Sequence, residues 1–200
     1  MPLPRKAAKK AEPASVINFP QKYYVIGADL GLKRPGFCKL TVENTESGKR
    51  LTDISLMSVD NKNDRKKPHG ELLNEIMNAF SSFIPDTEKE GVPCFYIREK
   101  EIMDRKLPSE RDISKVVGLT DWLLWRMGES WRDIYPVTIK KYVAGSGRAD
   151  KSAVAESLPY YIGSLSFAND DESDAAAVAV AWLLQQGEIK PKPGKEEEKS

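Results

Sequence analysis

One aspartate stands inside a stretch that is otherwise apolar. Residues 23–26 read Tyr-Tyr-Val-Ile, a β-branched and aromatic run typical of a buried strand, and Asp29 follows between Gly27 and Gly31. A buried carboxylate is costly unless an ion pair, backbone hydrogen bonds or a bound cation compensates it. The two glycines keep the nearby backbone uncrowded, as a ligand site requires. Asp29 is therefore either a paired structural carboxylate or a functional one.

Three more acidic residues occur where strands and helices are expected to end or begin. Glu99 follows the apolar run 92–98, and Asp171 and Asp174 are spaced i, i+3 at the start of the last helical segment, on one face of its first turn. Each has a simple structural explanation, because a strand-end glutamate can be solvated and acidic residues complement the dipole at a helix start. Their joint occurrence with Asp29 favours a shared site.

Such a cluster of carboxylates would repel itself without a cation. Two cysteines and one histidine are too few for a structural zinc site. Oxygen ligands, and hence Mg²⁺ or Mn²⁺, are expected instead. Two such ions about 4 Å apart can clamp a phosphodiester, one activating a water and the other stabilising the leaving 3′ oxygen. The acidic residues point to phosphodiester hydrolysis if the fold brings them together.

The elements that must position these residues follow from the hydrophobic periodicity. Alternating or continuous apolar runs predict strands, and stripes with a helical repeat predict helices. The first three strands are predicted to form an antiparallel meander. The later strands alternate with helices, which predicts a mixed sheet with parallel strands and helices on its faces. The expected strands cover 22–32, 37–42, 51–59, 92–98 and 133–135, and the expected helices cover 69–84, 109–127, 137–143, 153–158 and 172–186.

Composition limits the class of protein. The chain has 200 residues and a formal net charge of +1, enough length for one domain with a substantial core. No apolar run approaches the length of a membrane span, and residues 1–15 lack the apolar region of a secretory signal. Cys38 and Cys94 fall in expected strands and are interpreted as core residues of a protein in a reducing, cytoplasmic compartment. We expect a basic disordered arm over 1–20, a folded domain over 21–187 and a charged disordered tail over 188–200.

Three blocks of the sequence resemble RuvC-type Holliday junction resolvases, nucleases with the RNase H-like fold. Residues 26–31 (Ile-Gly-Ala-Asp-Leu-Gly) are similar to the family's opening Gly-x-Asp-x-Gly strand. Residues 136–151 are similar to its Lys-Lys … Gly-x-Gly-x-Ala-x-Lys segment, the most specific of the three, and residues 171–179 to its Asp-x-x-Asp-Ala helix. The resemblance covers about residues 22–186. Actin-like ATPases share the first-strand motif but need a second lobe that this chain is too short to hold, so no nucleotide cofactor is expected.

The resemblance implies an α/β, RNase H-like fold with a mixed five-stranded sheet flanked by helices. It implies a metal-dependent, structure-selective endonuclease that resolves four-way (Holliday) DNA junctions by paired symmetric nicks. Two Mg²⁺ ions per active site are implied, with Mn²⁺ as a substitute, in a homodimer acting on branched DNA in the bacterial cytoplasm or, for a phage protein, in that of its host. The implied metal ligands and catalytic residues are Asp29, Glu99, Asp171 and Asp174, joined in catalysis by Lys151, and the implied DNA contacts are Lys140, Lys141, Arg148 and Lys151.

Two of the implied ligands have alternatives. Glu101 lies on the same strand face as Glu99 and can replace it as the second ligand. Asp170 adjoins Asp171, although the spacing to Asp174 favours Asp171. Lys141 and Arg148 can equally be solvated surface residues.

The function also has alternatives. Family members often carry an aromatic residue shortly after the glutamate, where this chain has Ile102 and Met103, so the strictness of junction specificity is open. A relaxed nuclease that cuts flaps or forks, or a non-catalytic junction-binding scaffold, are the alternative functions. Trp122 and Trp125, in the expected helix 109–127, can form the dimer face or belong to the core.

Overall fold

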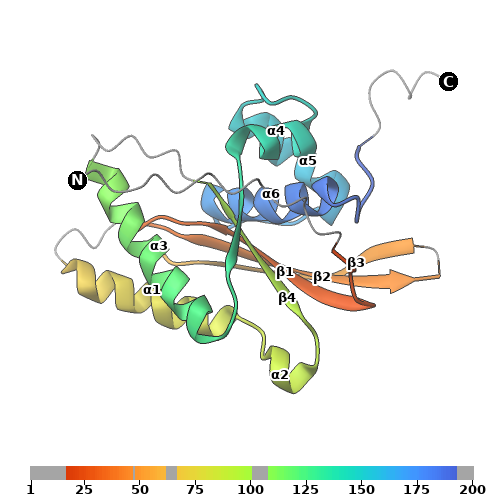
Figure 1. Cartoon of the computed structure of the whole chain (residues 1–200). Helices are drawn as coiled ribbons and strands as arrows, with labels where there is room; N and C mark the ends of the chain where they lie inside the picture. The colour runs from red at the N-terminus through yellow and green to blue at the C-terminus, as the bar shows by residue number, and fades with distance from the viewer. Residues whose placement is uncertain (1–16, 47, 62–66, 101–107, 193–200) are drawn as a thin grey trace, which may run out of the picture.

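The computed structural model describes residues 17–46, 48–61, 67–100 and 108–192 of the chain. Within these ranges, one mixed sheet has the strand order β3-β2-β1-β4-β5, and helices cover both of its faces (Figure 1). The strands are β1 (Lys22–Asp29), β2 (Gly36–Thr45), β3 (Gly48–Ser58), β4 (Cys94–Glu99) and β5 (Trp131–Ile134). The helices are α1 (His69–Phe83), α2 (Thr87–Glu90), α3 (Pro108–Arg126), α4 (Pro136–Ala144), α5 (Lys151–Ile162) and α6 (Asp170–Gln185).

The sheet joins an antiparallel half to a parallel half at β1. Strands β1, β2 and β3 form the predicted antiparallel meander. Strand β4 pairs in parallel with β1 on its other side, and β5 pairs in parallel with β4. Parallel neighbours need a crossover connection, and α1 and α3 are the long helices in these two connections. The predicted fold class, a mixed five-stranded sheet flanked by helices, is confirmed.

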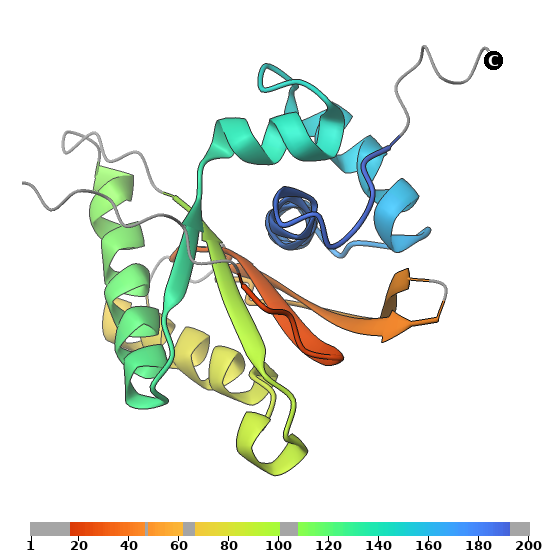
Figure 2. The ribbon, with the colours of Figure 1, turned by 45° about the vertical axis from the view of Figure 1, so that its right-hand side comes forward.

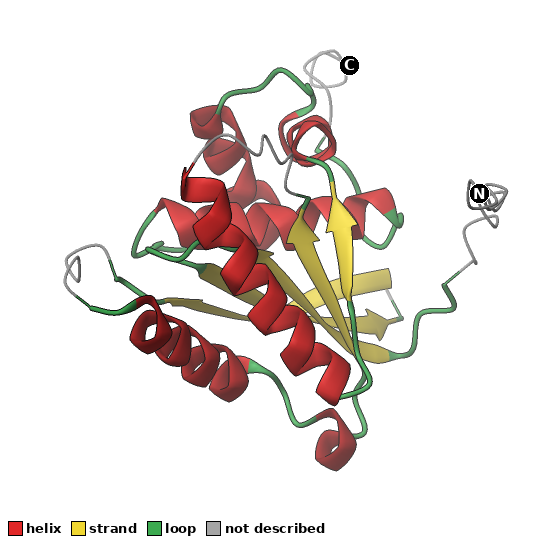
Figure 3. Cartoon of the chain, turned by 60° about the vertical axis from the view of Figure 1, so that its left-hand side comes forward, coloured by secondary structure: helices red, strands yellow, loops and turns green. Residues whose placement is uncertain are grey.

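Alternation along β1 divides the core into two layers. Tyr23 and Val25 pack beneath α6, whereas Ile26 and Ala28 pack with Phe80 of α1 on the opposite face. Figure 2 shows α6 end-on between the sheet and the α4–α5 pair, and Figure 3 shows α1 and α3 along the other face. The face that carries odd-numbered β1 residues is therefore the one that meets α6.

Helix α6 lies unusually close to the sheet because small residues meet on both sides. A Cβ atom added to Gly27 would lie 2.2 Å from the carbonyl oxygen of Ala175 and 2.7 Å from the backbone nitrogen of Ala179. The sequence suggested that Gly27 clears space for a ligand, but the structure uses that space for α6. Gly31 faces open loop instead, with no atom nearer than 3.8 Å to such a Cβ.

Two helices differ from the prediction. Helix α5 extends to Ile162 rather than 158 despite Pro159 inside it, since Val154, Leu158 and Ile162 continue a buried i, i+4 stripe. Helix α2 was not predicted, and its four residues have none buried. Such a short, fully polar helix has no hydrophobic repeat from which it could be predicted.

The chain ends add to the core beyond the expected domain limits. Ile17 and Phe19, in the predicted arm, pack against the core under α6. Glu188, in the predicted tail, is buried and accepts hydrogen bonds from the Tyr23 hydroxyl and the Lys49 ammonium. Cys38 and Cys94 are buried free thiols, as predicted. No helix in the described part of the chain has the length and apolar character needed to cross a bilayer.

Candidate active site

Strands β1 and β4 place two of the predicted acids side by side. Their register pairs Ala28 with Arg98, and Asp29 and Glu99 are the next residues along each strand. Val25 and Ile97 belong to the core under α6, so the two-residue period turns Asp29 and Glu99 toward α6 as well. Because the two strands are parallel, residues that are 70 positions apart in sequence thus lie side by side at the C-terminal ends of β1 and β4.

The first turn of α6 presents the other two acids and is fixed by a polar network. The Asn169 side chain accepts the N–H of Glu172 (3.1 Å), and the Glu172 carboxylate accepts the N–H of Ala168 (2.9 Å), a reciprocal cap of the helix start. The Ser58 hydroxyl at the end of β3 donates to Glu172 (2.9 Å) and accepts from Asn169 (2.8 Å). This network sets where the α6 side chains stand relative to the sheet.

Sequence reasoning missed these three positioning residues. The Asn169-x-x-Glu172 spacing is a capping signature and could have been recognised. The part played by Ser58 could not, because it depends on β3 and α6 meeting across 111 residues of sequence.

The loop after β1 holds Asp171. A Cβ atom at Gly36 would lie 2.1 Å from the carbonyl oxygen of Asp171, so only glycine lets the two backbones come this close. The same loop directs Arg34 to Asp171, with 2.8 Å between Arg34 Nε and Asp171 Oδ2. The contact is an ion pair without hydrogen-bond alignment, since the Nε–H of Arg34 has no aligned acceptor among the described residues. Burial raises the pKa of Asp171, and the Arg34 charge opposes that rise.

Lys151 supplies a positive charge to the fourth acid. It begins α5, directly after Asp150, whose carboxylate caps the helix by accepting the N–H of Ala153 (2.8 Å). The Lys151 Nζ donates to Asp174 Oδ2 at 2.5 Å, although 78% of the lysine side chain stays exposed. This hydrogen bond raises the pKa of Lys151. The ammonium group therefore lies among the acids, while most of the lysine side chain faces solvent.

A cavity of about 200 Å³ joins these groups. Asp29, Glu99 and Asp174 line it together with Lys140 and Lys151. Ile139, Val154 and Ala177 contribute apolar walls. Asp171 is not part of this lining and forms an ion pair with Arg34 instead. The cavity thus combines three carboxylates with two ammonium groups, a charge pattern suited to a phosphate and its counter-cations.

Burial and mutual repulsion disfavour the ionised form of the carboxylates in the cavity. Burial first, then the charges of Asp174 and Glu99, raises the pKa of Asp29 to about 7, against the opposing charge of Lys151. Partial desolvation and Asp174 also raise the pKa of Glu99, although its side chain keeps contact with solvent. Carboxylates with raised pKa values in a cleft are enriched at functional sites.

The donor chemistry fits a hard divalent cation. All four acids offer carboxylate oxygen, and the Asp29 side chain has neither a hydrogen bond nor an ion pair within the ranges that the structure describes. No three acidic, cysteine or histidine side chains in those ranges already converge as a complete chelate. Instead, Arg34 forms an ion pair with Asp171, and Lys151 forms one with Asp174. Two of the four acids are therefore neutralised by positively charged side chains of the protein.

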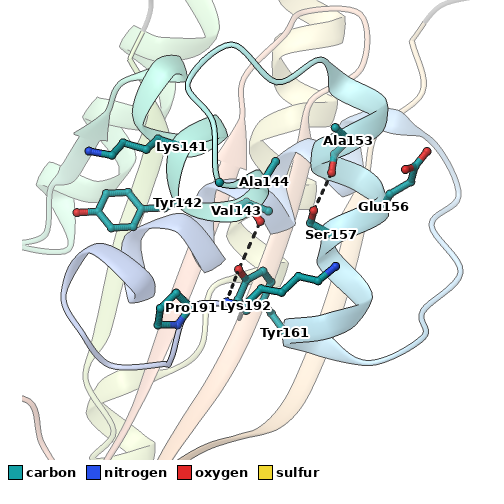
Figure 4. Close-up of a pocket in the computed structure, with 11 residues that line it drawn as sticks. Lys141, Tyr142, Val143, Ala144, Ala153, Glu156, Ser157, Tyr161, Pro191 and Lys192 are labelled. Atoms are coloured by element: carbon teal, nitrogen blue, oxygen red, sulfur yellow. Dashed lines mark hydrogen bonds between the residues drawn. The ribbon is translucent and has the colours of Figure 1, made fainter. Parts of the chain in front are cut away.

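The predicted DNA-contacting residues divide into two groups. Lys140 and Lys151 line the acidic cavity. Lys141 lines a second hollow of about 500 Å³ between α4, α5 and residues 191–192 (Figure 4). There the Tyr161 hydroxyl accepts the Lys192 N–H at 3.2 Å and donates to the Val143 carbonyl at 3.4 Å. The Arg148 side chain is exposed.

The structure bears on one of the two alternative acidic ligands, Asp170, and on the alternatives for the two tryptophans. Asp170 is exposed and does not line the cavity, whereas Asp171 acts electrostatically on Asp29. Glu101 lies outside the described residues. The core alternative for Trp122 and Trp125 is wrong, because 51% and 72% of these residues are exposed on α3.

Comparisons with known proteins agree with this geometry. No protein-family model matches the sequence. The crossover junction endodeoxyribonuclease RuvC of Bradyrhizobium diazoefficiens is 26% identical over 158 residues, which cover 78% of this chain and 83% of the relative. RuvC of Prochlorococcus marinus is 26% identical over 166 residues, covering 82% and 98%.

Solved structures show the same fold. RuvC of T. thermophilus in complex with a Holliday junction substrate aligns with a TM-score of 0.66 at 19% identity, covering 85% of this chain and 99% of that chain. The fowlpox virus resolvase in complex with Holliday junction DNA aligns with a TM-score of 0.50 at 16% identity, covering 80% and 99%. The predicted resemblance and the RNase H-like fold are confirmed.

Proposed function

We propose that the chain is a RuvC-type resolvase, a metal-dependent endonuclease that cuts four-way DNA junctions by paired symmetric nicks. The observation that carries this proposal is the cavity in which Asp29, Glu99 and Asp174 meet Lys140 and Lys151. Relatives that align along about four fifths of the chain are named crossover junction endodeoxyribonucleases, which supports a nuclease. Carboxylates alone would repel a phosphodiester, whereas carboxylates with bound cations and adjacent lysines attract it.

Asp29, Glu99, Asp171 and Asp174 would hold the metal. We propose Mg²⁺, with Mn²⁺ as a substitute, because the donor set is entirely oxygen. Bound divalent ions supply an activated water and stabilise the leaving 3′ oxygen. The chain's own contribution is orientation: the β1–β4 register and the α6 cap fix three ligands, and Arg34 fixes the fourth. Lys140 of α4 and Lys151 of α5, which both line the cavity, would neutralise the scissile phosphate.

A homodimer fits the substrate and an exposed face of the protein. A four-way junction has two opposing strands to nick, so two active sites related by a two-fold axis can act on both. Helix α3 exposes Trp122 and Trp125, and Met127 is exposed directly after its last residue, so large apolar side chains face water here. We propose that a second copy of the chain covers this face. We also propose that the protein acts in the bacterial cytoplasm, either as a bacterial protein or as a phage protein in its host, because the relatives described above are bacterial.

The test compares cutting of a labelled four-way junction, a flap, a fork and linear duplex with Mg²⁺ or Mn²⁺. The native protein should nick opposing junction strands symmetrically, and Asp29→Asn should lower the rate by about 100-fold or more. Asp170→Asn is the matched control and should leave the rate unchanged, since Asp170 is exposed in the same helical turn as Asp171.

Each other outcome replaces the proposal with a defined alternative. Equal cutting of flaps and forks would replace the resolvase with a relaxed branch nuclease. Tight junction binding without nicking under either metal would leave a junction-binding scaffold.

A further inference from the structure

Arg34 is a mostly buried cation whose ion pair, within the described ranges, is with a proposed metal ligand. Its side chain is 18% exposed, and its Nε lies 2.8 Å from Asp171 Oδ2. The Nε–H nonetheless lacks a hydrogen-bond acceptor among the described residues, so charge rather than directed hydrogen bonding holds the two groups together. A guanidinium has five donors in a planar fork, which suits an anion with several oxygens. The pairing with Asp171 thus leaves at least one donor of Arg34 unsatisfied.

The backbone is fixed on both sides of Arg34. The Lys33 carbonyl accepts the N–H of Asn61 at 2.7 Å, and the Pro35 carbonyl accepts the N–H of Val59 at 3.2 Å. Asn61 is itself buried, so water does not compete for this anchor. The loop between β1 and β2 is therefore held by the segment that follows β3. Arg34 can change its partner by side-chain rotation alone, without a rearrangement of the loop.

Arg34 and the two lysines of the cavity come from different parts of the fold. Lys140 belongs to α4 and Lys151 to α5, whereas Arg34 lies in the loop between β1 and β2. Its partner Asp171 contributes to the raised pKa of Asp29, a carboxylate that lines the cavity, so Arg34 lies within electrostatic range of the same site. The acids therefore have cations on two separate supports, and Arg34 is the one outside the cavity lining.

One carboxylate cannot hold a guanidinium and a divalent cation equally well. A cation bound by Asp171 neutralises that carboxylate and repels Arg34. A mostly buried arginine that loses its anion is costly, whereas a DNA phosphate offers oxygens that the guanidinium fork matches. Resting on the proposed function, we propose that Arg34 exchanges Asp171 for a phosphate of the DNA when a divalent cation occupies the acids.

This exchange makes Arg34 a conditional DNA contact. In the metal-free protein Asp171 holds Arg34, which then adds little to the affinity for DNA. With the acids occupied, Arg34 adds about one phosphate contact. Cation and DNA therefore strengthen each other's binding, and by thermodynamic linkage each raises the affinity for the other by the same factor.

The test measures binding of a labelled four-way junction with and without a divalent cation. Ca²⁺ is the probe because it binds carboxylate oxygen, and denaturing gels verify that the DNA stays intact. In saturating Ca²⁺, Arg34→Gln should weaken junction binding about tenfold, but in EDTA by less than about twofold. The salt dependence gives a second readout. Its logarithmic slope should become shallower by about 0.9 in the variant, in Ca²⁺ only.

Lys33→Gln is the matched control. Lys33 is the exposed neighbour of Arg34 in the same loop and carries the same charge. Its loss should change junction affinity by the same factor with and without Ca²⁺, because no carboxylate exchange is expected there. Arg34→Lys keeps the charge but not the fork, so its affinity in Ca²⁺ should lie between those of the native protein and Arg34→Gln. Circular dichroism in both conditions verifies that each variant is folded.

The outcomes separate this proposal from the proposed function. If Arg34→Gln weakens binding equally in Ca²⁺ and in EDTA, or in neither, the exchange is overturned, while the resolvase stands if the native protein nicks junctions with Mg²⁺. A native protein whose junction affinity does not respond to Ca²⁺ overturns the exchange in the same way. A native protein that neither prefers junctions nor nicks them overturns both proposals.

Discussion

Asp29 carries the largest electrostatic cost among the site residues. Its pKa is raised to about 7 by burial and by the neighbouring acids, from a usual value near 4. Below pH 4 both folded and unfolded chains hold the proton, and the shift has no effect on stability. Between pH 4 and 7 the unfolded chain ionises more readily than the folded one, so the folded state loses stability as the pH rises. Above pH 7 the full loss persists.

We therefore expect the metal-free protein to be less stable at pH 8 than at pH 5 by a few kcal/mol on account of this group. Asp29→Asn should remove most of that difference, because the amide cannot ionise. Mg²⁺ should restore stability at pH 8 and have little effect at pH 5, where the proton competes with it. Urea unfolding at both pH values measures this. The assignment would be contradicted if Asp29→Asn kept the stability difference between pH 5 and pH 8, or if the control Asp170→Asn lost it.

Arg34 pairs with Asp171, the acid outside the cavity lining. Its side chain and that of Asp171 are only 18% and 26% exposed, so their pairing is stronger than that of surface ions. Arg34→Gln should lower the free energy of unfolding of the metal-free protein by about 2 kcal/mol. Mg²⁺ should then raise the melting temperature more in the variant than in the native protein, because Asp171 has lost its cation.

Thermal unfolding with and without Mg²⁺ measures this effect of Arg34. Arg148→Gln, an exposed arginine, should respond like the native protein. Equal gains from Mg²⁺ in all three proteins would show that Arg34 and the metal do not share Asp171.

Among the secondary-structure elements, the start of α6 links stability to the site, because its capping network positions the turn that carries Asp171 and Asp174. Glu172 is buried and joins Ser58 to the backbone N–H of Ala168, so its loss leaves Asn169 as the remaining hydrogen-bond link in this network between the helix start and β3. We expect Glu172→Ala to cost roughly 2 kcal/mol of stability. It should also reduce nicking more than junction binding, because the displaced groups are ligands rather than DNA contacts.

Denaturant unfolding and parallel binding and cutting assays measure the two effects of Glu172→Ala. Asp170→Ala is the control, since this acid lies in the same turn and is exposed. Loss of binding in step with cutting would show that Glu172 supports the DNA surface instead of the acids.

The contact between β1 and α6 depends on one glycine. Gly27→Ala would place a methyl group 2.2 Å from the backbone of α6, and backbone cannot give way as a flexible side chain can. We expect a loss of about 3 kcal/mol and a displaced Asp174. Gly31→Ala, only four residues away, meets no atom closer than 3.8 Å and should remain near native stability. Melting temperatures of the two variants decide the point, and similar values would refute this account of Gly27.

At the scale of the whole molecule, the exposed tryptophans of α3 define the expected oligomer. Trp125→Glu should raise the dimer dissociation constant about 30-fold or more, because burying a charge opposes association. Sedimentation velocity over a range of concentrations measures this, with Tyr160→Glu as the equally aromatic control on α5. The resulting monomer should lose paired nicking before it loses single nicks. A native protein that sediments as a monomer at all concentrations would exclude this interface.

Local sequence patterns were sufficient to predict the strands, the long helices and the acidic residues of the site. Short-range patterns carry that information, because the two-residue strand period, the helical stripe and the i, i+3 spacing of Asp171 and Asp174 need no knowledge of distant contacts. The order and approximate extent of the strands and long helices, the buried thiols and the strand-end position of Glu99 followed from them, although β1 ends three residues earlier, β2 three residues later and β3 begins three residues earlier than predicted. Helix α2 and the extension of α5 did not, since both depart from those local patterns.

Which side chains contact one another depends on how the whole chain packs. Arg34 reaches Asp171, Lys151 reaches Asp174 and Ser58 reaches Glu172, each across more than 20 residues of chain. The structure also separated Lys141 from Lys140, and it placed the tryptophans of α3 outside rather than inside the core. These facts depend on the order of strands in the sheet and on the face that each helix covers. Both are set by packing of the whole chain, which no local stretch of sequence specifies.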